Sequence, residues 1–175
     1  MREMLERVAA GELTPEQAEV MLAGQGFTDL GFAKVDTQRA ARTGVGEVVY
    51  GAGKTAEQIA KICRALAAAG QPCVLVTRLD AEKAREVDCL LAQADGEAPA
   101  GLAFEYRPIP KLGIYGTIPA PARASYVAVA CAGTSDLYCA EEAAVTAEVL
   151  GSRVVRLYDV GVAGIHRLLA HADDL

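Results

Sequence analysis

The sequence contains no tryptophan, and Phe, Trp and Tyr together make up only 5% of its 175 residues. The 17 basic residues are scattered and are outnumbered by 23 acidic ones, which gives a formal net charge of −6. Because protein surfaces that bind nucleic acids are strongly basic, this balance argues against a nucleic-acid partner. No apolar run reaches the length of a membrane span, and the charged residues 1–12 do not resemble a signal peptide. We therefore expect a cytoplasmic protein that binds neither membranes nor nucleic acids.

The cysteines form no C-x-x-C pair and have no zinc-binding spacing. In a cytoplasmic protein they are expected to be buried free thiols. His166 and His171 are five positions apart, which corresponds to about 140° around a helix and suits a shared metal poorly. The sequence thus predicts no structural metal. The cysteines are Cys63, Cys73, Cys89, Cys131 and Cys139.

Just over half of the residues are apolar (52%), enough for a hydrophobic core in one domain or in two small ones. Short apolar runs bounded by turn residues alternate with segments of helical period, which predicts an α/β fold. The expected helices cover residues 1–10, a segment opened by Thr14 and Pro15 with Gln17 at the capping-box position, and residues 39–43, 55–69, 81–94 and 137–150. The expected strands cover residues 32–36, 48–50, 73–77, 102–106, 125–130 and 153–157.

Residues 107–121 are rich in proline and glycine and have no periodicity. We predict that they form a linker or a long loop. The chain is accordingly divided into two α/β units, residues 1–121 and residues 122–175.

The most informative stretch is Ala-Gly-Thr-Ser-Asp at residues 132–136, between a strand expected to be buried and a helix. Gly133, Thr134, Ser135 and Asp136 lie where backbone N–H groups are unpaired and where the helix dipole favours an anion, so a phosphate fits there. The alternative is a Ser/Asp cap on an ordinary βα turn. In the helix that follows, three glutamates are expected to face solvent: Glu141, Glu142 and Glu148.

A second loop of this kind follows one βα unit later and carries Asp159, Gly161, Gly164, His166 and Arg167. Because the carboxyl ends of parallel strands meet at one edge of a sheet, we expect the two loops to share a site. The histidine is able to shuttle a proton, and the arginine is able to hold a phosphate with two hydrogen bonds. Taken alone, such a histidine is more often a helix-start or packing residue.

Residues 51–55 (Gly-Ala-Gly-Lys-Thr) end like a P-loop, but that motif requires a glycine where Val48 stands. A shorter anion-binding turn with Lys54 at the helix start is one interpretation. A glycine turn with Thr55 as the helix cap is the other. Just upstream, Lys34, Asp36 and Arg39 belong to a charged cluster, and most such clusters are solvated charges.

Several segments in combination resemble the LarB family, the first enzymes of nickel-pincer cofactor biosynthesis. They are AGTSDL with AEEAAVTAE, YDVGVAGIHRLL, GFAKVDTQRAAR and EVVYGAGKTAEQI. The second unit is also similar, more distantly, to PurE, the carboxyaminoimidazole ribonucleotide mutase, where a G-S-x-S-D turn and an A-H-R segment hold the substrate. The resemblance implies that residues 122–175 begin a PurE-like, flavodoxin-like doubly wound parallel sheet whose further strands lie beyond Leu175.

The resemblance also implies a reaction. LarB carboxylates the pyridinium ring of nicotinic acid adenine dinucleotide with CO2 and cleaves the phosphoanhydride, giving pyridinium-3,5-biscarboxylic acid mononucleotide and AMP. By this resemblance His166 and Asp136 take part in catalysis, no cofactor is tightly bound, Mg2+ is compatible, and the protein is a homo-oligomer, as the PurE octamer is. The implied substrate-binding residues are Gly133, Thr134, Ser135, Asp136, Asp159, Gly161, Gly164, Arg167, Lys34, Asp36, Arg39 and Lys54.

In LarB a cysteine thiolate adds to the ring before carboxylation, and the resemblance places that cysteine beyond Leu175. Cys139 is an alternative nucleophile, because it lies in the first turn of a helix, where thiol pKa values are depressed. A small inward-packing residue is the other interpretation. Two other functions stay open: a non-catalytic nucleotide-binding module, and a PurE-type mutase that acts on an aminoimidazole ribonucleotide.

Overall fold

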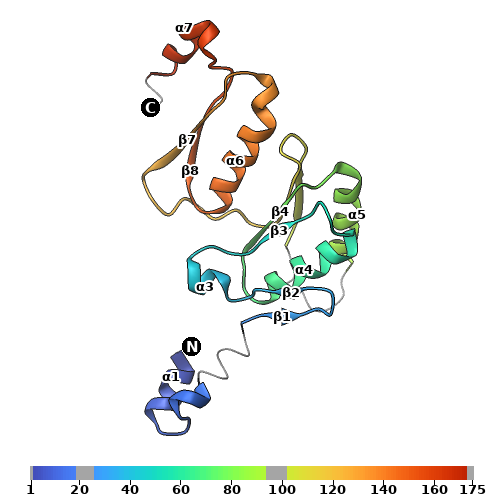
Figure 1. The fold of residues 1–175 in the computed structure, drawn as a ribbon, viewed down its shortest axis with the longest axis vertical. Coiled ribbons are helices and arrows are strands. Elements are labelled where there is room, and N and C mark those ends of the chain that lie inside the picture. Colours follow the sequence, from blue (N-terminus) through green and yellow to red (C-terminus); the bar gives the residue numbers. More distant parts are fainter. Residues whose placement is uncertain (1, 19–25, 94–101, 173–175) are drawn as a thin grey trace.

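The computed structural model describes residues 2–18, 26–93 and 102–172, and it has the α/β fold that the sequence predicts (Figure 1). A small β1–β2 pair and a mixed four-stranded sheet come first, followed by a two-stranded parallel sheet with its own helix. No helix within these ranges is long and apolar enough to cross a bilayer. The elements are α1 (Arg2–Ala9), β1 (Thr28–Asp29), β2 (Lys34–Val35), α3 (Arg39–Thr43), β3 (Val48–Tyr50), α4 (Ala56–Ala68), β4 (Cys73–Thr77), α5 (Ala81–Ala92), β5 (Phe104–Arg107), β6 (Leu112–Gly116), β7 (Tyr126–Ala130), η1 (Thr134–Asp136), α6 (Leu137–Val149), β8 (Arg153–Leu157), η2 (Val162–Gly164) and α7 (Ile165–Leu169).

The second N-terminal helix begins as the sequence predicts, whereas the predicted start of the first helix, Met1, lies outside the described residues. After α1, residues 15–18 are helical, and Thr14 and Gln17 hydrogen-bond to each other at the start of this helix. The hydroxyl of Thr14 accepts from the backbone N–H of Gln17 at 3.2 Å, and the Gln17 side chain accepts from the backbone N–H of Thr14 at 2.9 Å. This capping box satisfies two amides that a helix start otherwise leaves unpaired.

α4 is the main helix of the first unit and begins with the same device. Thr55 is its N-cap, and Thr55 and Gln58 form a reciprocal capping box with contacts of 3.3 and 3.1 Å. Its apolar residues recur at helical spacing and face the sheet, which is why this helix is held in place by burial as well as by propensity. The buried face consists of Ala56, Ile59, Ala60, Ile62, Cys63, Leu66 and Ala67.

The prediction that residues 107–121 form a linker is wrong for β6. This strand lies inside the sheet, whose order is β3-β4-β6-β5, and it pairs antiparallel with both neighbours. Its glycines suggested a turn, but packing requires them. A Cβ on Gly113 would lie 2.6 Å from the Phe104 ring, and Gly116 has a φ of +106°. In the same strand Leu112 and Ile114 are at most 1% exposed, as in the core of a sheet.

β4 separates two apolar layers. Val74 and Val76 pack with α4 and α5 on one face of the sheet. Cys73 and Leu75 point to the other face, where Val145 of α6 joins them. Because successive side chains of a strand alternate between faces, β4 is buried on both sides, and α6 is packed against the four-stranded sheet.

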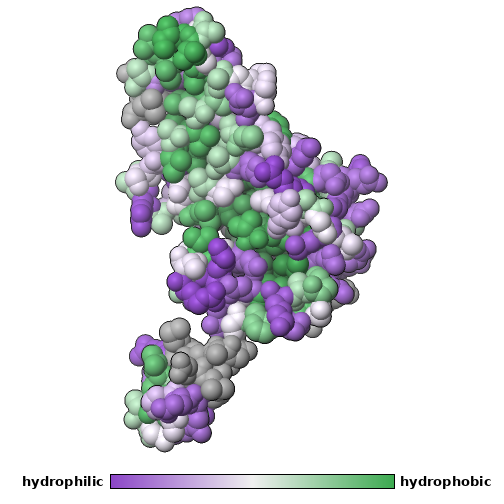
Figure 2. Space-filling model, viewed as in Figure 1, coloured by the Kyte–Doolittle hydropathy of each residue, from purple (hydrophilic) through white to green (hydrophobic). Residues whose placement is uncertain are grey.

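The second unit is a βαβ arrangement in which β7 and β8 pair in parallel and α6 connects them. The prediction that β7 is buried is wrong: Tyr126 is 38% and Val127 is 42% exposed. Within the described residues this sheet has two strands, and α6 packs on one face of it (Figure 1). Apolar surface is therefore left open on this unit, and it continues over η2 and α7, where Val162 and Leu169 are exposed (Figure 2).

The three glutamates of α6 do not face solvent as predicted. Glu148 accepts two hydrogen bonds from Arg156 of β8 at 2.5 and 2.9 Å, and Glu141 accepts one at 3.2 Å. Glu142 is ion-paired with Arg78 at 3.3 Å. The expectation failed because it assumed that each carboxylate is solvated, whereas Arg156 of β8, which lies under the helix, pairs with Glu141 and Glu148.

Candidate functional site

The loops that follow β7 and β8 lie side by side. Beyond the last strand pair, the N–H of Cys131 donates to Leu157 O at 3.0 Å. The N–H groups of Val160 and Gly161 then donate to the carbonyls of Cys131 and Ala132, both at 3.1 Å. The backbone pairing thus continues out of the sheet, and the two loops predicted to share a site are joined at the carboxyl edge of both strands.

Gly161 explains how closely the loops approach. A Cβ at this position would lie 2.7 Å from the carbonyl oxygen of Ala132. Real Cβ atoms do not come that close to backbone, so a larger residue would push the loops apart.

The first loop forms η1 and leads directly into α6. The backbone N–H of Gly133 donates to Asp136 Oδ2 at 3.2 Å, and the backbone N–H of Asp136 donates back to Gly133 O at 3.0 Å. The carboxylate therefore closes its own turn. Thr134 and Ser135 are exposed, so two hydroxyls and the start of a 13-residue helix are open to an incoming anion.

In the second loop, Arg167 Nη1 lies 2.5 Å from Asp159 Oδ2, and both side chains are partly exposed. Asp159 adopts a φ of +59°, which is unfavourable for a residue other than glycine. Gly164 gives room to this pair, because a Cβ there would lie 2.8 Å from Arg167 Nε. His166 is exposed on α7. Arg167 is thus held by Asp159, and an anionic ligand would have to compete with this carboxylate for the guanidinium.

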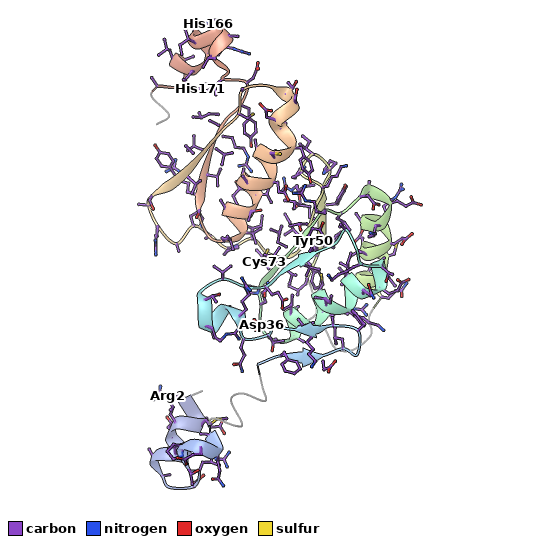
Figure 3. All side chains as sticks on the ribbon, in the orientation of Figure 1. Arg2, Asp36, Tyr50, Cys73, His166 and His171 are labelled. Atoms are coloured by element: carbon purple, nitrogen blue, oxygen red, sulfur yellow. The ribbon has the colours of Figure 1, made fainter. Side chains whose placement is uncertain are left out.

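The upstream charged cluster lies at another part of the molecule (Figure 3). Asp36 is held by Arg42 through two contacts of 3.0 and 2.6 Å, and this guanidinium lowers the pKa of the Asp36 carboxyl. The ammonium of Lys34 lies 5.2 Å from the ring centre of Phe27, while Arg39 is exposed. In Figure 3 Asp36 lies beside the four-stranded sheet, whereas His166 lies at the far end of the second unit, so the structure does not bring the two groups together.

Lys54 is folded back on its own loop. Its ammonium donates to Tyr50 O at 3.1 Å. Gly51 before it donates its N–H to Thr77 O at 2.8 Å, and a Cβ there would lie 2.8 Å from the same oxygen. The first glycine of this turn is therefore required by the close approach of the loop to β4.

Sequence reasoning did not single out a third group, which lines a cavity at the ends of β3 and β4. It includes Arg78, Lys83, Lys111 and Tyr138. The signal that could have found part of it is the strand-end rule, because Arg78 directly follows a parallel strand that was predicted with its correct bounds.

The cysteines are free, and the prediction that all of them are buried is wrong for Cys89 and Cys139, which are exposed. Burial raises the pKa of the Cys63 thiol to about 12 and that of Cys73 to about 11. Neither is a thiolate near neutral pH, so neither is suited to nucleophilic attack. In the part of the chain that the structure describes, no three His, Cys, Asp or Glu side chains lie close enough to hold a metal ion.

We expect these buried thiols to make stability fall at alkaline pH. Their folded pKa values lie above the ordinary thiol value of 9.0, so their contribution to stability is fully present below pH 9 and is lost as the pH rises through about 11 to 12. Urea unfolding between about pH 8 and about pH 10.5 should show a declining free energy of unfolding, with up to about 1.4 kcal/mol per pH unit for each thiol. Cys63→Ala should flatten this slope. An unchanged slope in Cys63→Ala, or an equal flattening in the exposed control Cys89→Ala, would contradict the assignment.

Comparison with known families adds to this geometry. Residues 27–107 match the LarB/PurE-like N-terminal domain. This part of the chain is similar to LarB/PurE-like N-terminal domains. The resemblance to LarB that the sequence predicts is confirmed there. The matched region runs from just before β1 to the last residue of β5, so β6 completes the four-stranded sheet from outside the matched residues.

A second comparison finds a relative that is similar over a longer stretch of the chain. The chain is 34% identical over 145 residues to an uncharacterized protein from Methanocaldococcus jannaschii. The alignment covers 77% of this chain and 51% of the relative, so the chain spans about half the length of the curated protein it matches.

Proposed function

We propose that this protein takes part in LarB-type carboxylation of a nicotinic acid dinucleotide. The substrate is nicotinic acid adenine dinucleotide, and CO2 and water are consumed as the ring gains a carboxylate and the phosphoanhydride is cleaved to release AMP. One observation carries the proposal: two loops rich in glycine, hydroxyl and cationic groups are joined by hydrogen bonds at the carboxyl edge of β7 and β8. The LarB/PurE-like domain beside them supports it.

In this proposal the first loop binds a phosphate of the substrate. The backbone N–H groups at the start of α6 and the hydroxyls of Thr134 and Ser135 are the donors. Asp136 holds ribose hydroxyls with the oxygen that does not accept from Gly133. Both hydroxyl residues are exposed, so no other element has to move for an anion to reach them.

The second loop supplies a cation and a proton carrier. Arg167 leaves Asp159 for a second anionic group of the substrate, and His166 moves a proton or orients the ring. Gly161 and Gly164 keep the loop close enough for both. The proposal also includes a contact from Lys54, a cytoplasmic homo-oligomer, and no tightly bound cofactor. Lys34, Asp36 and Arg39 lie away from His166 in one chain, so in this proposal they contact the substrate bound by another subunit of the homo-oligomer.

The activity is tested by mass spectrometry of the products. The 175-residue chain and, in parallel, the relative from M. jannaschii are incubated with nicotinic acid adenine dinucleotide and bicarbonate, with and without Mg2+. The expected products are AMP and a mononucleotide that is one carboxylate heavier than nicotinic acid mononucleotide. Binding without product would favour a nucleotide-binding module, and turnover of an aminoimidazole ribonucleotide alone would favour a PurE-type mutase.

Arg167→Gln should weaken binding of the dinucleotide to this chain by about tenfold to a hundredfold, because a charge-assisted contact contributes about 1.5–3 kcal/mol. The exposed pair with Asp159 stabilises the fold little, so the melting temperature should hardly change. Isothermal titration calorimetry measures the affinity. Arg85→Gln removes the same charge from an exposed position on α5 and is the control. Equal affinities of Arg167→Gln and Arg85→Gln for the dinucleotide would show that Arg167 does not bind it.

A further inference from the structure

The carboxyl ends of β3 and β4 open into a cavity of about 290 Å³ that the function proposed above does not use. β3 and β4 are parallel neighbours, and Gly51 and Arg78 are the first residues after them. Ligands of α/β sheets bind outside the carboxyl ends of such strands. The lining residues are Ala52, Arg78, Asp80, Lys83, Lys111 and Tyr138.

Three cationic side chains reach this cavity from three separate elements. Arg78 follows β4, Lys83 lies in the first turn of α5, and Lys111 precedes β6. The only carboxylate among the lining residues is Asp80, which caps α5 by accepting from the backbone N–H of Lys83 at 2.8 Å. The lining therefore carries an excess of two positive charges in a protein whose overall charge is −6.

The cations are only partly neutralised by their surroundings. Lys83 Nζ lies 4.0 Å from Asp80 Oδ2 and 3.4 Å from Gly51 O. Arg78 is ion-paired with Glu142 at 3.3 Å. Among residues 2–18, 26–93 and 102–172, no carboxylate lies within ion-pair distance of the Lys111 ammonium. At least one full positive charge thus faces the cavity without a counter-ion from the described chain.

The backbone at this cavity is strained, and the strain positions the cations. Arg78 has a φ of 56° and Lys111 a φ of 51°, and Asp159 is the one other residue besides glycine with positive φ in the described ranges. The left-handed conformation is unfavourable for such residues and is found where surrounding structure enforces it, often at binding sites. Here the N–H of Leu79 donates to Lys111 O at 2.9 Å, which ties the two turns together and holds both cations on one rim.

Tyr138 connects this cavity to the first loop of the second unit. It lies in the first turn of α6, two residues after Asp136, and its hydroxyl accepts a hydrogen bond from Arg78. The Arg78 guanidinium carbon also lies 5.3 Å from the centre of the Tyr138 ring. The cavity therefore borders the helix that the candidate site uses, although its cations come from the four-stranded sheet.

We infer that this cavity is a binding site for a phosphate or diphosphate group. A multiply charged, compact anion suits several cations on one rim better than a single carboxylate does, because each cation adds a charge-assisted hydrogen bond. The start of α5 adds further positive potential. The site belongs to the LarB/PurE-like domain and its neighbouring strand, and the inference holds whether or not the carboxylation proposed above takes place.

Calorimetric titration with inorganic pyrophosphate at low ionic strength tests the site in the 175-residue chain. Lys111→Asn removes the unpaired charge and keeps a residue that tolerates the left-handed conformation, and Lys83→Gln removes a second charge. Each should weaken pyrophosphate binding about tenfold, which corresponds to about 1.4 kcal/mol. Lys61→Gln makes the same charge change on α4 outside the cavity and should leave the affinity unchanged.

The outcome that would overturn the inference is an affinity for pyrophosphate that Lys111→Asn and Lys83→Gln leave unchanged, or that Lys61→Gln lowers equally. A loss shared by all three variants would reflect overall charge and no site. Circular dichroism of each variant confirms that it is folded before titration.

A second titration identifies the carrier of the phosphate. Nicotinic acid adenine dinucleotide replaces pyrophosphate, with the same variants. If Lys111→Asn weakens binding of both, the cavity holds the diphosphate of the dinucleotide. If it weakens pyrophosphate binding alone, the cavity takes a free anion. Both results support an anion site. The activity test above fails or succeeds on a different readout, so the two proposals are judged separately.

Discussion

Gly116→Ala should lower the free energy of unfolding by about 3 kcal/mol or more, a large share of the roughly 5–15 kcal/mol by which a folded domain is usually stable. The glycine ends β6 with a φ of +106°, a conformation that an L-residue with a side chain rarely adopts. A Cβ there would also lie 2.2 Å from the carbonyl oxygen of Pro72. That oxygen cannot retreat easily, because it accepts from the N–H of Thr117 at 3.1 Å beside the β4–β6 pair.

Urea unfolding followed by circular dichroism measures this loss, and Gly53→Ala is the matched control. Gly53 lies in the turn after β3, and a Cβ there would meet no heavy atom within 4 Å. We expect this substitution to change the free energy of unfolding by less than about 1 kcal/mol, with a small gain because alanine restricts the unfolded chain. Equal stability of the two variants would show that β6 can turn out of the sheet at another residue.

Ile114→Ala should cost about 2–5 kcal/mol, the usual range for a buried isoleucine cut back to alanine. Ile114 is 1% exposed at the centre of β6 and belongs to the apolar layer that includes Leu75 and Val145. Because Val145 comes from α6, the substitution weakens the packing of the second unit against the sheet as well as the sheet itself.

Thermal unfolding by calorimetry and urea titration measure the effect. Ile109→Ala is the control, because Ile109 is 53% exposed between β5 and β6 and its loss should change stability by about 0.5 kcal/mol or less. A cost below about 1 kcal/mol for Ile114→Ala would mean that the two units are held together by something other than this apolar layer.

Much of the fold was predictable because its signals are local. α3, β3, β4 and β8 have the bounds that the sequence predicts, since caps, apolar runs and glycine stops all lie within a few residues of the element. β1 was missed, because two residues carry too little pattern. β6 was missed because its glycines are required by close contacts with Phe104 and Pro72, and the sequence of the strand does not reveal these contacts.

The candidate site was predictable in part for the same reason. The strand-end rule brought the loops after β7 and β8 together, and the backbone pairing between them follows from two parallel strands. The ion pair of Arg167 with Asp159 and the contact of Arg78 with Tyr138 depend on how chain segments fold back. The second of these joins residues 60 positions apart. No periodicity or motif in the sequence predicts a contact between residues so far apart in the chain.

The contact of Arg78 with Tyr138 also has a practical consequence for spectroscopy. Since the chain contains no tryptophan, Tyr138→Trp would give it a single indole, stacked under a guanidinium at the border of the anion cavity and of the loop that opens α6. Its emission would depend on whether the cation stays over the ring. The indole would thereby report on the contact between the two units by its fluorescence at one wavelength, without an added dye.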